Sequence, residues 1–197
     1  MSVYNFTPSP DLSTKEQNYA FWNDAFSDSE ISRIRQMGDS ANLQNSVLGV
    51  DLKVHDDIRK SKTAEFAFND DTAFIYNNLA YVARQLNAQF FDFDISGFVE
   101  DIQYMVYDSG GDHYTWHMDK GNLNNPPRKL SMVMQLSDSD EYEGGDLEFM
   151  LGPDIIKAER TKGIIYMFPS WILHRVTPVT AGTRRSLVVW IAGPRFR

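Results

Sequence analysis

Three side chains far apart in the sequence could together hold a metal ion. His117 and Asp119 are two residues apart, so on a β-strand both would point to the same face. His174 follows 55 residues after Asp119, a gap long enough for intervening strands to return beside the first. Two neutral imidazoles and one carboxylate on one side of a metal form the facial triad that binds non-haem Fe(II) and leaves positions open. We predict an iron centre at these three residues.

An arginine ten residues beyond the last of these ligands supplies a second chemical feature. A fixed cation near the metal at Arg184 would suit the distal end of a chelating dicarboxylate co-substrate. Arg185 is adjacent, and strand alternation sends one of the two inward and the other to solvent. Which of the two points inward depends on the register of the strand, and a slip of one residue would exchange them.

The ordinary interpretation of each histidine has to be weighed against the metal site. A lone His in a strand is more often a hydrogen-bonded structural residue than a ligand, so His-x-Asp alone is a weak signal. His174, in a later strand-like run after Phe168-Pro169, strengthens the metal hypothesis. The remaining histidines, His55 and His113, have no such spacing, and we interpret them as structural.

Composition excludes several classes of protein. The 197 residues are 42% hydrophobic and carry a net charge of −8 without a basic block, which argues against nucleic acid as the main partner. The chain contains no cysteine, so it has no disulfides or thiolate metal sites. No apolar run is long enough to span a membrane, and the first residues show no signal peptide. We therefore expect a cytoplasmic protein of one structural domain; its oligomeric state is left open.

The first half of the chain predicts helices packed on a sheet. Ser27 and Glu30 fit a capping box ahead of a helix that Gly38 should stop. A second amphipathic helix is expected over residues 72–87. Residues 43–53 favour a short strand, and residues 56–63 a charged loop.

From residue 90 onward the pattern changes to strands. Residues 90–95 alternate, residues 97–107 continue as a β-rich run, and the region as a whole shows about eight short strands without intervening helices. Such spacing predicts a closed sandwich or jelly roll. The expected fold is mainly β (α+β), with residues 1–95 as an N-terminal arm, helices and supporting strands, and residues 96–197 as the catalytic core.

The run from His174 to Arg184 resembles the carboxyl-terminal signature of the prolyl 4-hydroxylase-like Fe(II)/2-oxoglutarate oxygenases, most of all the bacterial and phage PiuC-type branch. The resemblance extends over about residues 96–193. The positions that carry it are Tyr107, Gly110 or Gly111, Tyr114, His117, Asp119, Gly144-Gly145, Phe168, His174, Arg184 and Trp190.

This resemblance implies a double-stranded β-helix with His117, Asp119 and His174 as catalytic iron ligands. It implies that Arg184 pairs with the C5 carboxylate of 2-oxoglutarate and that Tyr107 lies over this co-substrate. Ser131, Val133 and Gln135 would share the face lining its pocket. Gln135 stands where the animal hypoxia-sensing prolyl hydroxylases have a tyrosine that helps to hold C5.

The predicted function is an Fe(II)/2-oxoglutarate-dependent dioxygenase that uses O₂, with ascorbate as reductant, and hydroxylates a C–H bond. A peptidyl proline is the best substrate hypothesis, on the resemblance alone. A free amino acid or other small molecule is an alternative substrate. A non-catalytic metal-binding jelly-roll module is the alternative from another class. A zinc hydrolase is a third option. The sequence, however, contains no general-base motif for such an enzyme, and Arg184 would have no role in it.

Overall fold

The computed structural model describes residues 17–47, 55–120 and 127–195. Its helices are α1 (Asp28–Ser40), α2 (Ala73–Leu86) and the five-residue π-helix η1 (Asn87–Phe91). Its strands are β1 (Ala20–Trp22), β2 (Gln44–Asn45), β3 (Arg59–Lys60), β4 (Lys62–Phe66), β5 (Gly97–Phe98), β6 (Ile102–Asp108), β7 (His113–His117), β8 (Arg128–Gln135), β9 (Tyr142–Gly144), β10 (Leu147–Leu151), β11 (Asp154–Lys157), β12 (Ile165–Pro169), β13 (Leu173–Val176) and β14 (Val179–Ala192).

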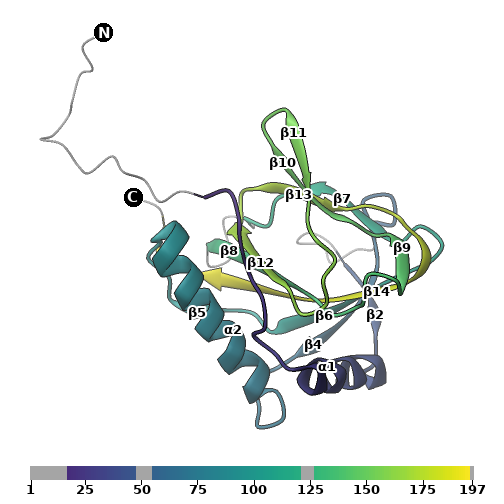
Figure 1. The fold of residues 1–197 in the computed structure, drawn as a ribbon, viewed down its shortest axis with the longest axis horizontal. Coiled ribbons are helices and arrows are strands. Elements are labelled where there is room, and N and C mark those ends of the chain that lie inside the picture. Colours follow the sequence, from purple (N-terminus) through teal and green to yellow (C-terminus); the bar gives the residue numbers. More distant parts are fainter. Residues whose placement is uncertain (1–16, 48–54, 121–126, 196–197) are drawn as a thin grey trace, which may run out of the picture.

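Two antiparallel sheets face each other across the interior of the molecule (Figure 1). The major sheet runs β1-β12-β8-β14-β6-β4-β2, with β5 and β9 also paired to β14. The minor sheet runs β11-β10-β13-β7-β3. The predicted mainly β jelly-roll fold with supporting N-terminal helices is confirmed.

Strand alternation separates the two faces of the major sheet. On β14, Leu187, Val189 and Ile191 belong to the large apolar core that also includes the buried sides of α1 and α2. The alternate residues of β14, Ser186 and Val188 among them, point toward the minor sheet. Figure 1 shows both helices on the outer side of the major sheet. The helices therefore cover one face, and the other face remains available for chemistry.

Helix α1 begins as predicted. The Ser27 side chain accepts from the backbone N–H of Glu30, and the Glu30 carboxylate accepts from the backbone N–H of Ser27. The helix does not stop at Gly38 but continues to Ser40. Gly38 is buried because the ring of Tyr104 lies directly against it: a Cβ at residue 38 would be 2.4 Å from that ring. The glycine provides space for packing rather than a helix end.

Helix α2 confirms the second predicted helix, expected over residues 72–87. Its N-cap is Thr72. The Asn69 side chain accepts from the backbone N–H groups of Asp71 and Thr72, which forms a turn ahead of the helix. Among the described residues, no helix is long and apolar enough to cross a membrane.

The predicted loop over residues 56–63 is wrong, because β3 and the start of β4 lie there. Lys60 and Lys62 made the segment look solvated. Lys60 pairs with Asp112 at 3.2 Å and Lys62 with Asp108 at 3.0 Å, and both strands lie near sheet edges. Lysine is a common edge residue because it discourages pairing with other chains. Of the strand expected over residues 43–53, only β2 is observed, and residues 48–54 lie outside the described residues.

The predicted strand over residues 90–95 is also wrong. The chain leaves α2 through η1, and Asp92 then adopts a left-handed conformation with φ 54°. The Asn87 side chain bonds both the N–H and the C=O of Phe93, which fixes this turn. Phe91 is buried in the core and contacts Phe93. The alternating pattern therefore belongs to a π-helical turn and the left-handed residue after it, and not to a strand.

We expect Gly38→Ala to destabilise the protein although alanine favours helix. The propensity gain is about 1 kcal/mol, whereas overpacking a filled core costs about 1–3 kcal/mol. Tyr104 cannot move easily, because its hydroxyl donates to Asp39 at 2.8 Å and its ring stacks on Phe66. Denaturant unfolding should show a lower free energy of unfolding, with the exposed Gln36→Ala as control. A more stable Gly38→Ala protein would contradict this packing.

Candidate metal centre and co-substrate cavity

The two candidate histidine ligands lie on neighbouring strands. His117 at the end of β7 is paired in register with His174 on β13. Partners in an antiparallel pair point to the same face, so the two imidazole rings meet with centroids 4.1 Å apart. Phe168 contacts the His174 ring edge-on at 4.7 Å and forms an apolar wall beside it.

Asp119 reaches the same point from outside the strand. Strand β7 ends at His117, so the shared face expected from strand periodicity does not position this carboxylate. Its backbone N–H instead donates to the carbonyl of Ser170 at 2.8 Å. Oδ1 lies 3.5 Å from His117 Nε2, and Oδ2 lies 3.5 Å from His174 Nε2. The structure thus brings the three predicted residues together, with ligand atoms all within 4.8 Å of one another.

The hydrogen bonds of both imidazoles suit metal binding. His117 Nδ1 lies 2.7 Å from the carbonyl oxygen of Thr115, and His174 Nδ1 lies 2.9 Å from that of Ile172. A carbonyl only accepts, so each Nδ1 carries the proton and each Nε2 keeps a free lone pair. Two neutral nitrogens and one carboxylate converging in this way fit one divalent cation with open coordination positions.

A hydroxyl pair supports the carboxylate. Ser131 Oγ donates to Asp119 Oδ2 at 2.8 Å and lies 3.0 Å from Ser170 Oγ. Ser131 was expected to line the co-substrate pocket; here its hydroxyl is engaged with the ligand carboxylate. The indole N–H of Trp190 faces the same carboxylate without completing a hydrogen bond. Asp119 is therefore oriented by the major sheet while the histidines come from the minor sheet.

The protonation of the cluster also favours metal binding. Burial and the neighbouring His174 lower the pKa of His117 to about 4, despite the opposing effect of Asp119. Burial alone would raise the pKa of the Asp119 carboxyl, but His174, His117, Trp190 and Ser131 lower it below its ordinary value. At neutral pH the three groups are one carboxylate and nitrogen donors without a competing proton on His117.

Tyr114 joins the site because β7 is irregular. The register shifts between the pairs His174–His117 and Val176–Tyr114, so three residues on β7 match two on β13. Tyr114 and His117 consequently face the same side, and their rings stack at 3.4 Å. Burial raises the pKa of Tyr114 to about 12. Strand alternation alone would have placed the two side chains on opposite faces.

Arg184 occupies the interior beyond the metal cluster. It is only 2% exposed, donates to Ser186 Oγ at 3.1 Å and lies 5.5 Å from the ring centroid of Tyr107. Among the described residues no carboxylate pairs with it. Arg185 points outward and donates to Asp39 at 2.8 Å. The inward direction expected for Arg184 is the one observed, and a buried cation is left available for an anion.

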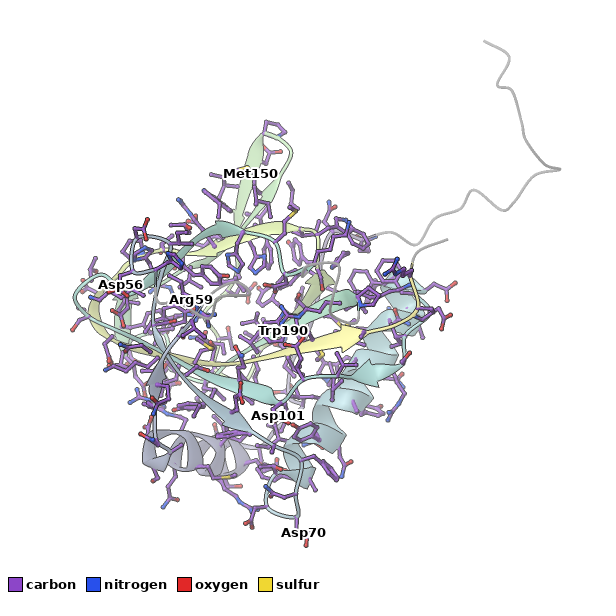
Figure 2. All side chains as sticks on the ribbon, turned by 180° about the vertical axis from the view of Figure 1, so that it is seen from behind. Asp56, Arg59, Asp70, Asp101, Met150 and Trp190 are labelled. Atoms are coloured by element: carbon purple, nitrogen blue, oxygen red, sulfur yellow. The ribbon has the colours of Figure 1, made fainter. Side chains whose placement is uncertain are left out.

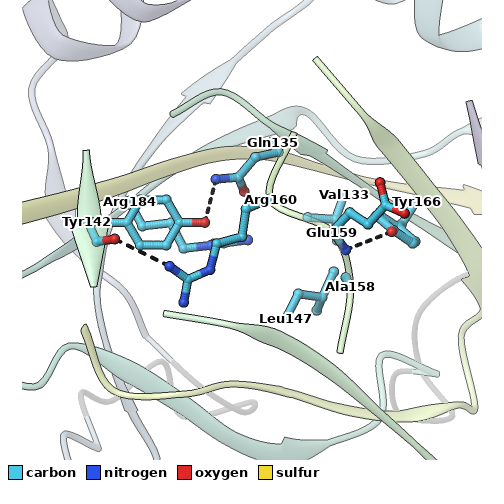
Figure 3. Close-up of a pocket in the computed structure, with 9 residues that line it drawn as sticks. All are labelled: Val133, Gln135, Tyr142, Leu147, Ala158, Glu159, Arg160, Tyr166 and Arg184. Atoms are coloured by element: carbon cyan, nitrogen blue, oxygen red, sulfur yellow. Dashed lines mark hydrogen bonds between the residues drawn. The ribbon is translucent and has the colours of Figure 1, made fainter. Parts of the chain in front are cut away.

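A narrow cavity lies in front of this guanidinium (Figure 3). Gln135 donates to the Tyr142 hydroxyl at 2.8 Å, and Arg160 donates to the Tyr142 carbonyl at 3.3 Å and to Asp146. Tyr142 was not predicted as a site residue, because it lies in an acidic stretch that resembles a solvated loop. The remaining lining is mostly apolar: Val133, Leu147, Ala158 and Tyr166, with Glu159 at one side.

Glycines bring β9 close enough to shape this cavity. Gly145 has φ 62°, and a Cβ there would lie 3.1 Å from Cδ of Arg184. Gly144 has φ 70°, and a Cβ there would lie 2.0 Å from the carbonyl oxygen of Pro178. Positive φ and backbone contact both require glycine. The Gly-Gly pair noted in the sequence is thus a structural requirement of the cavity.

The other histidines lie outside this cluster. His113 Nδ1 lies 2.7 Å from the carbonyl oxygen of Gly111, as a structural histidine would. The His55 carbonyl accepts from the backbone N–H groups of Ile58 and Arg59 in the turn before β3. The only group of three potential ligands among the described residues is the one at His117, Asp119 and His174.

Comparison with known proteins identifies similar chains. A family model described as the 2OG-Fe(II) oxygenase superfamily matches residues 102–192. A PKHD-type hydroxylase of Synechococcus sp. (strain CC9605) is 43% identical over 84 residues, which cover 42% of this chain and 38% of that protein. A PKHD-type hydroxylase of Idiomarina loihiensis is 35% identical over 85 residues, covering 41% and 37%. The chain spans less than half the length of these relatives.

Solved structures share the fold at low sequence identity. A prolyl hydroxylase from Trichoplax adhaerens, in complex with a hypoxia inducible factor peptide fragment, superimposes with a TM-score of 0.75 at 17% identity, covering 89% of this chain and 83% of that one. A prolyl-4-hydroxylase from Pseudomonas putida gives a TM-score of 0.70 at 18% identity, covering 90% and 94%.

We expect Ser131→Ala to weaken metal binding about 10–100-fold, the usual effect of losing a hydrogen bond that orients a ligand. The Asp119 carboxylate would lose its 2.8 Å partner while all three ligands remain. Anaerobic calorimetric titration with Fe²⁺ would measure the affinity. The exposed Ser109→Ala serves as control, and equal affinities in the two variants would show that Ser131 does not orient the ligand.

The metal-free protein should lose stability as the pH falls from 6.5 toward 4. The pKa of His117 is lowered to about 4 in the fold from 6.5, so between these values the unfolded chain binds a proton that the folded chain does not. The free energy of unfolding therefore rises with pH across this window, with a slope that corresponds to at most one bound proton. Denaturant unfolding of chelator-treated protein at several pH values would measure it.

The comparison variants are His117→Gln, which should flatten the slope, and His55→Gln, which should keep it. An unchanged slope in His117→Gln would assign the pH dependence to other groups.

Proposed function

We propose that this chain is an Fe(II)- and 2-oxoglutarate-dependent dioxygenase, because a 2OG-Fe(II) oxygenase superfamily model matches residues 102–192 and the similar proteins include PKHD-type hydroxylases and a prolyl-4-hydroxylase. One observation carries the proposal. The space between the two sheets contains both a His-Asp-His cluster and a buried arginine without a carboxylate partner among the described residues. We assign the catalytic core to residues 96–197 and a supporting role to residues 1–95.

His117, Asp119 and His174 would hold the ferrous ion, which supplies the activation of O₂ when bound. In the overall reaction, 2-oxoglutarate loses CO₂ and becomes succinate with one oxygen atom of O₂. The other oxygen atom enters a substrate C–H bond as a hydroxyl group. The reaction needs no general acid or base from the protein, whose task is to position the reactants and exclude water.

Arg184 would bind the C5 carboxylate of 2-oxoglutarate. A guanidinium in a dry cavity forms charge-assisted and paired hydrogen bonds with a carboxylate. Gln135 already donates to the Tyr142 hydroxyl, so the hydroxyl proton of Tyr142 is free for the same carboxylate. We propose that Gln135 and Tyr142 together act where Gln135 alone was expected, and that Tyr107 covers the co-substrate from β6.

The apolar lining supports this use of the interior. Val133, Leu147, Phe149 and Phe168 form a cluster between the sheets, adjoining both His174 and the cavity at Arg184. An environment of low polarity strengthens the pairing of Arg184 with an anion and keeps water from the oxidant. Most of this cluster comes from inward positions of β8, β10 and β12.

For the substrate, we propose a peptidyl proline. Support comes from two of the structures that share the fold, which are prolyl hydroxylases, one of them in complex with a peptide fragment. A free amino acid or other small molecule is the alternative substrate, and a non-catalytic metal-binding module is the alternative function. We further propose ascorbate as the reductant and a cytoplasmic setting, which the absence of cysteine suits.

The proposed function predicts that the protein converts 2-oxoglutarate to succinate with Fe²⁺ and ascorbate in air. Proline-containing peptides and free proline would be screened for a gain of 16 Da, the mass of the inserted oxygen atom. His174→Ala should abolish succinate formation, whereas His55→Ala should not, because His55 is outside the cluster. A protein that binds metal but forms no succinate under any of these conditions would be the non-catalytic module.

Arg184→Ala should raise the 2-oxoglutarate concentration needed for half-maximal succinate formation by two orders of magnitude or more. An unpaired buried charge typically costs about 3–5 kcal/mol. Arg185→Gln is the matched control, because the neighbouring side chain points outward to Asp39. If both variants kept the wild-type requirement, the cavity at Arg184 would not be the co-substrate site.

A further inference from the structure

A second arginine enters the interior from the edge of the minor sheet. Arg59 on β3 is paired in register with Tyr114 on β7, so both side chains lie on the inner face. The guanidinium carbon lies 4.9 Å from the Tyr114 ring centroid, and that ring stacks on His117. Figure 2 shows Arg59 and Trp190 labelled in the space between the two sheets. Arg59 is thus one aromatic ring away from the candidate metal ligands.

The hydrogen bonds of Arg59 leave its charge uncompensated. Its Nε donates to Ser61 Oγ at 3.1 Å, and its Nη2 contacts Met105 Sδ at 3.2 Å. A thioether is a weak acceptor, so the outer edge of the guanidinium stays available. The neighbouring cations Lys60 and Lys62 both pair with carboxylates. No carboxylate pairs with Arg59 anywhere in the described ranges.

Arg59 lines a groove of about 450 Å³ along β2, β4 and β6. Thr63 lines the same groove, and its buried hydroxyl has no hydrogen-bond partner. Thr63 is paired with Met105, which places its side chain on the inner face with Arg59. Gln103 and Glu65 provide further polar groups in the groove. An unbonded hydroxyl and an unpaired cation in one groove indicate a polar ligand with an anionic end.

The groove and the co-substrate cavity share a wall. Strand β6 presents Met105 to Arg59 and, two residues further on, Tyr107 to Arg184. The two arginines therefore lie at different places on the same inner face. The Tyr114 ring lies between Arg59 and the metal ligand His117. Arg184 accounts for the carboxylate of the co-substrate. Arg59 remains for a different anion.

We propose that Arg59 binds a carboxylate of the substrate, so that the enzyme hydroxylates a carboxylate-bearing molecule held in this groove. The proposal rests on the proposed dioxygenase function and specifies its substrate class. A single guanidinium suits a monoanion, and Glu65 in the same groove and the net charge of −8 disfavour a polyanion such as nucleic acid. The carboxylate belongs either to a free amino acid or to an acidic peptide.

Binding can be tested without turnover. The protein is loaded with Fe²⁺ and saturating 2-oxoglutarate under argon, so that Arg184 is already occupied. Calorimetric titration then makes two comparisons of an acid with its amide. The first compares L-amino acids with their primary amides. The second compares proline-containing peptides that carry glutamate with the same peptides carrying glutamine. Carboxylate members should bind more tightly than their amides, and the set that does so distinguishes a free amino acid from a peptide.

Arg59→Gln should weaken carboxylate binding about 10–100-fold, the equivalent of one charge-assisted hydrogen bond. Arg59→Lys keeps the charge and should retain part of the preference, which guards against a folding defect in the glutamine variant. Arg33→Gln is the matched control, because Arg33 lies on α1 over Phe74, outside the groove. Binding in this control should equal that of the wild type.

Three results would overturn the proposal: amides that bind as tightly as acids, carboxylate binding unchanged in Arg59→Gln, or no binding of any carboxylate probe. The dioxygenase function is judged separately, by succinate formation from 2-oxoglutarate in air without any probe. A protein that forms succinate but shows one of these three results retains its proposed function and loses the assignment of Arg59.

Discussion

The alternation of side chains along the major sheet is the constraint on which the site depends. Leu187, Val189 and Ile191 pack toward the helices, so Arg184 and Trp190 must face the minor sheet. A slip of one residue would expose the apolar set and move the guanidinium out of the cavity. Burial of three large side chains therefore fixes the direction of one charged side chain.

Outward-facing polar residues reinforce the same register. Arg185 donates to Asp39 on α1, and Asp39 also accepts from the Tyr104 hydroxyl on β6. This cluster connects the helix to two adjacent strands of the major sheet, β6 and β14. Burial raises the pKa of Tyr104 well above its usual range, so the hydroxyl remains a donor. The helices thus contribute to function indirectly, by holding the sheet that carries the cavity.

Sequence reasoning reached the metal cluster because the residue types are rare in this chain and their chemistry is restrictive. Only four histidines are present, and residue spacing with the family resemblance selected two of them. Periodicity also predicted both helices, since their apolar residues recur at helical spacing. These features depend on local patterns or on rare residue types, and both can be recognised in the sequence without the structure.

The parts that were missed depend on contacts between distant segments. Tyr142 faces the cavity because Gly144 and Gly145 allow β9 to approach β14, and Arg59 faces inward because β3 pairs with β7. Asp119 is held by a loop carbonyl and by Ser131 rather than by its own strand. Residues 90–95 alternate as a strand does, but Asn87 closes a turn there. At these positions strand pairing, a close approach that glycine allows, or a side-chain hydrogen bond outweighed the local pattern.

Burial of the Arg184 charge also costs free energy, and this cost affects how the cavity would bind an anion. Arg184 is buried, and no carboxylate among the described residues neutralises it, so an anion that pairs with it would stabilise the fold. The apolar core between the helices and the major sheet offsets this cost in the folded chain. An anion that binds only the folded state stabilises it by an amount that grows with the logarithm of its concentration relative to Kd. A neutral molecule of the same shape would leave the buried charge of Arg184 unpaired, so the cavity favours an anion over such a molecule.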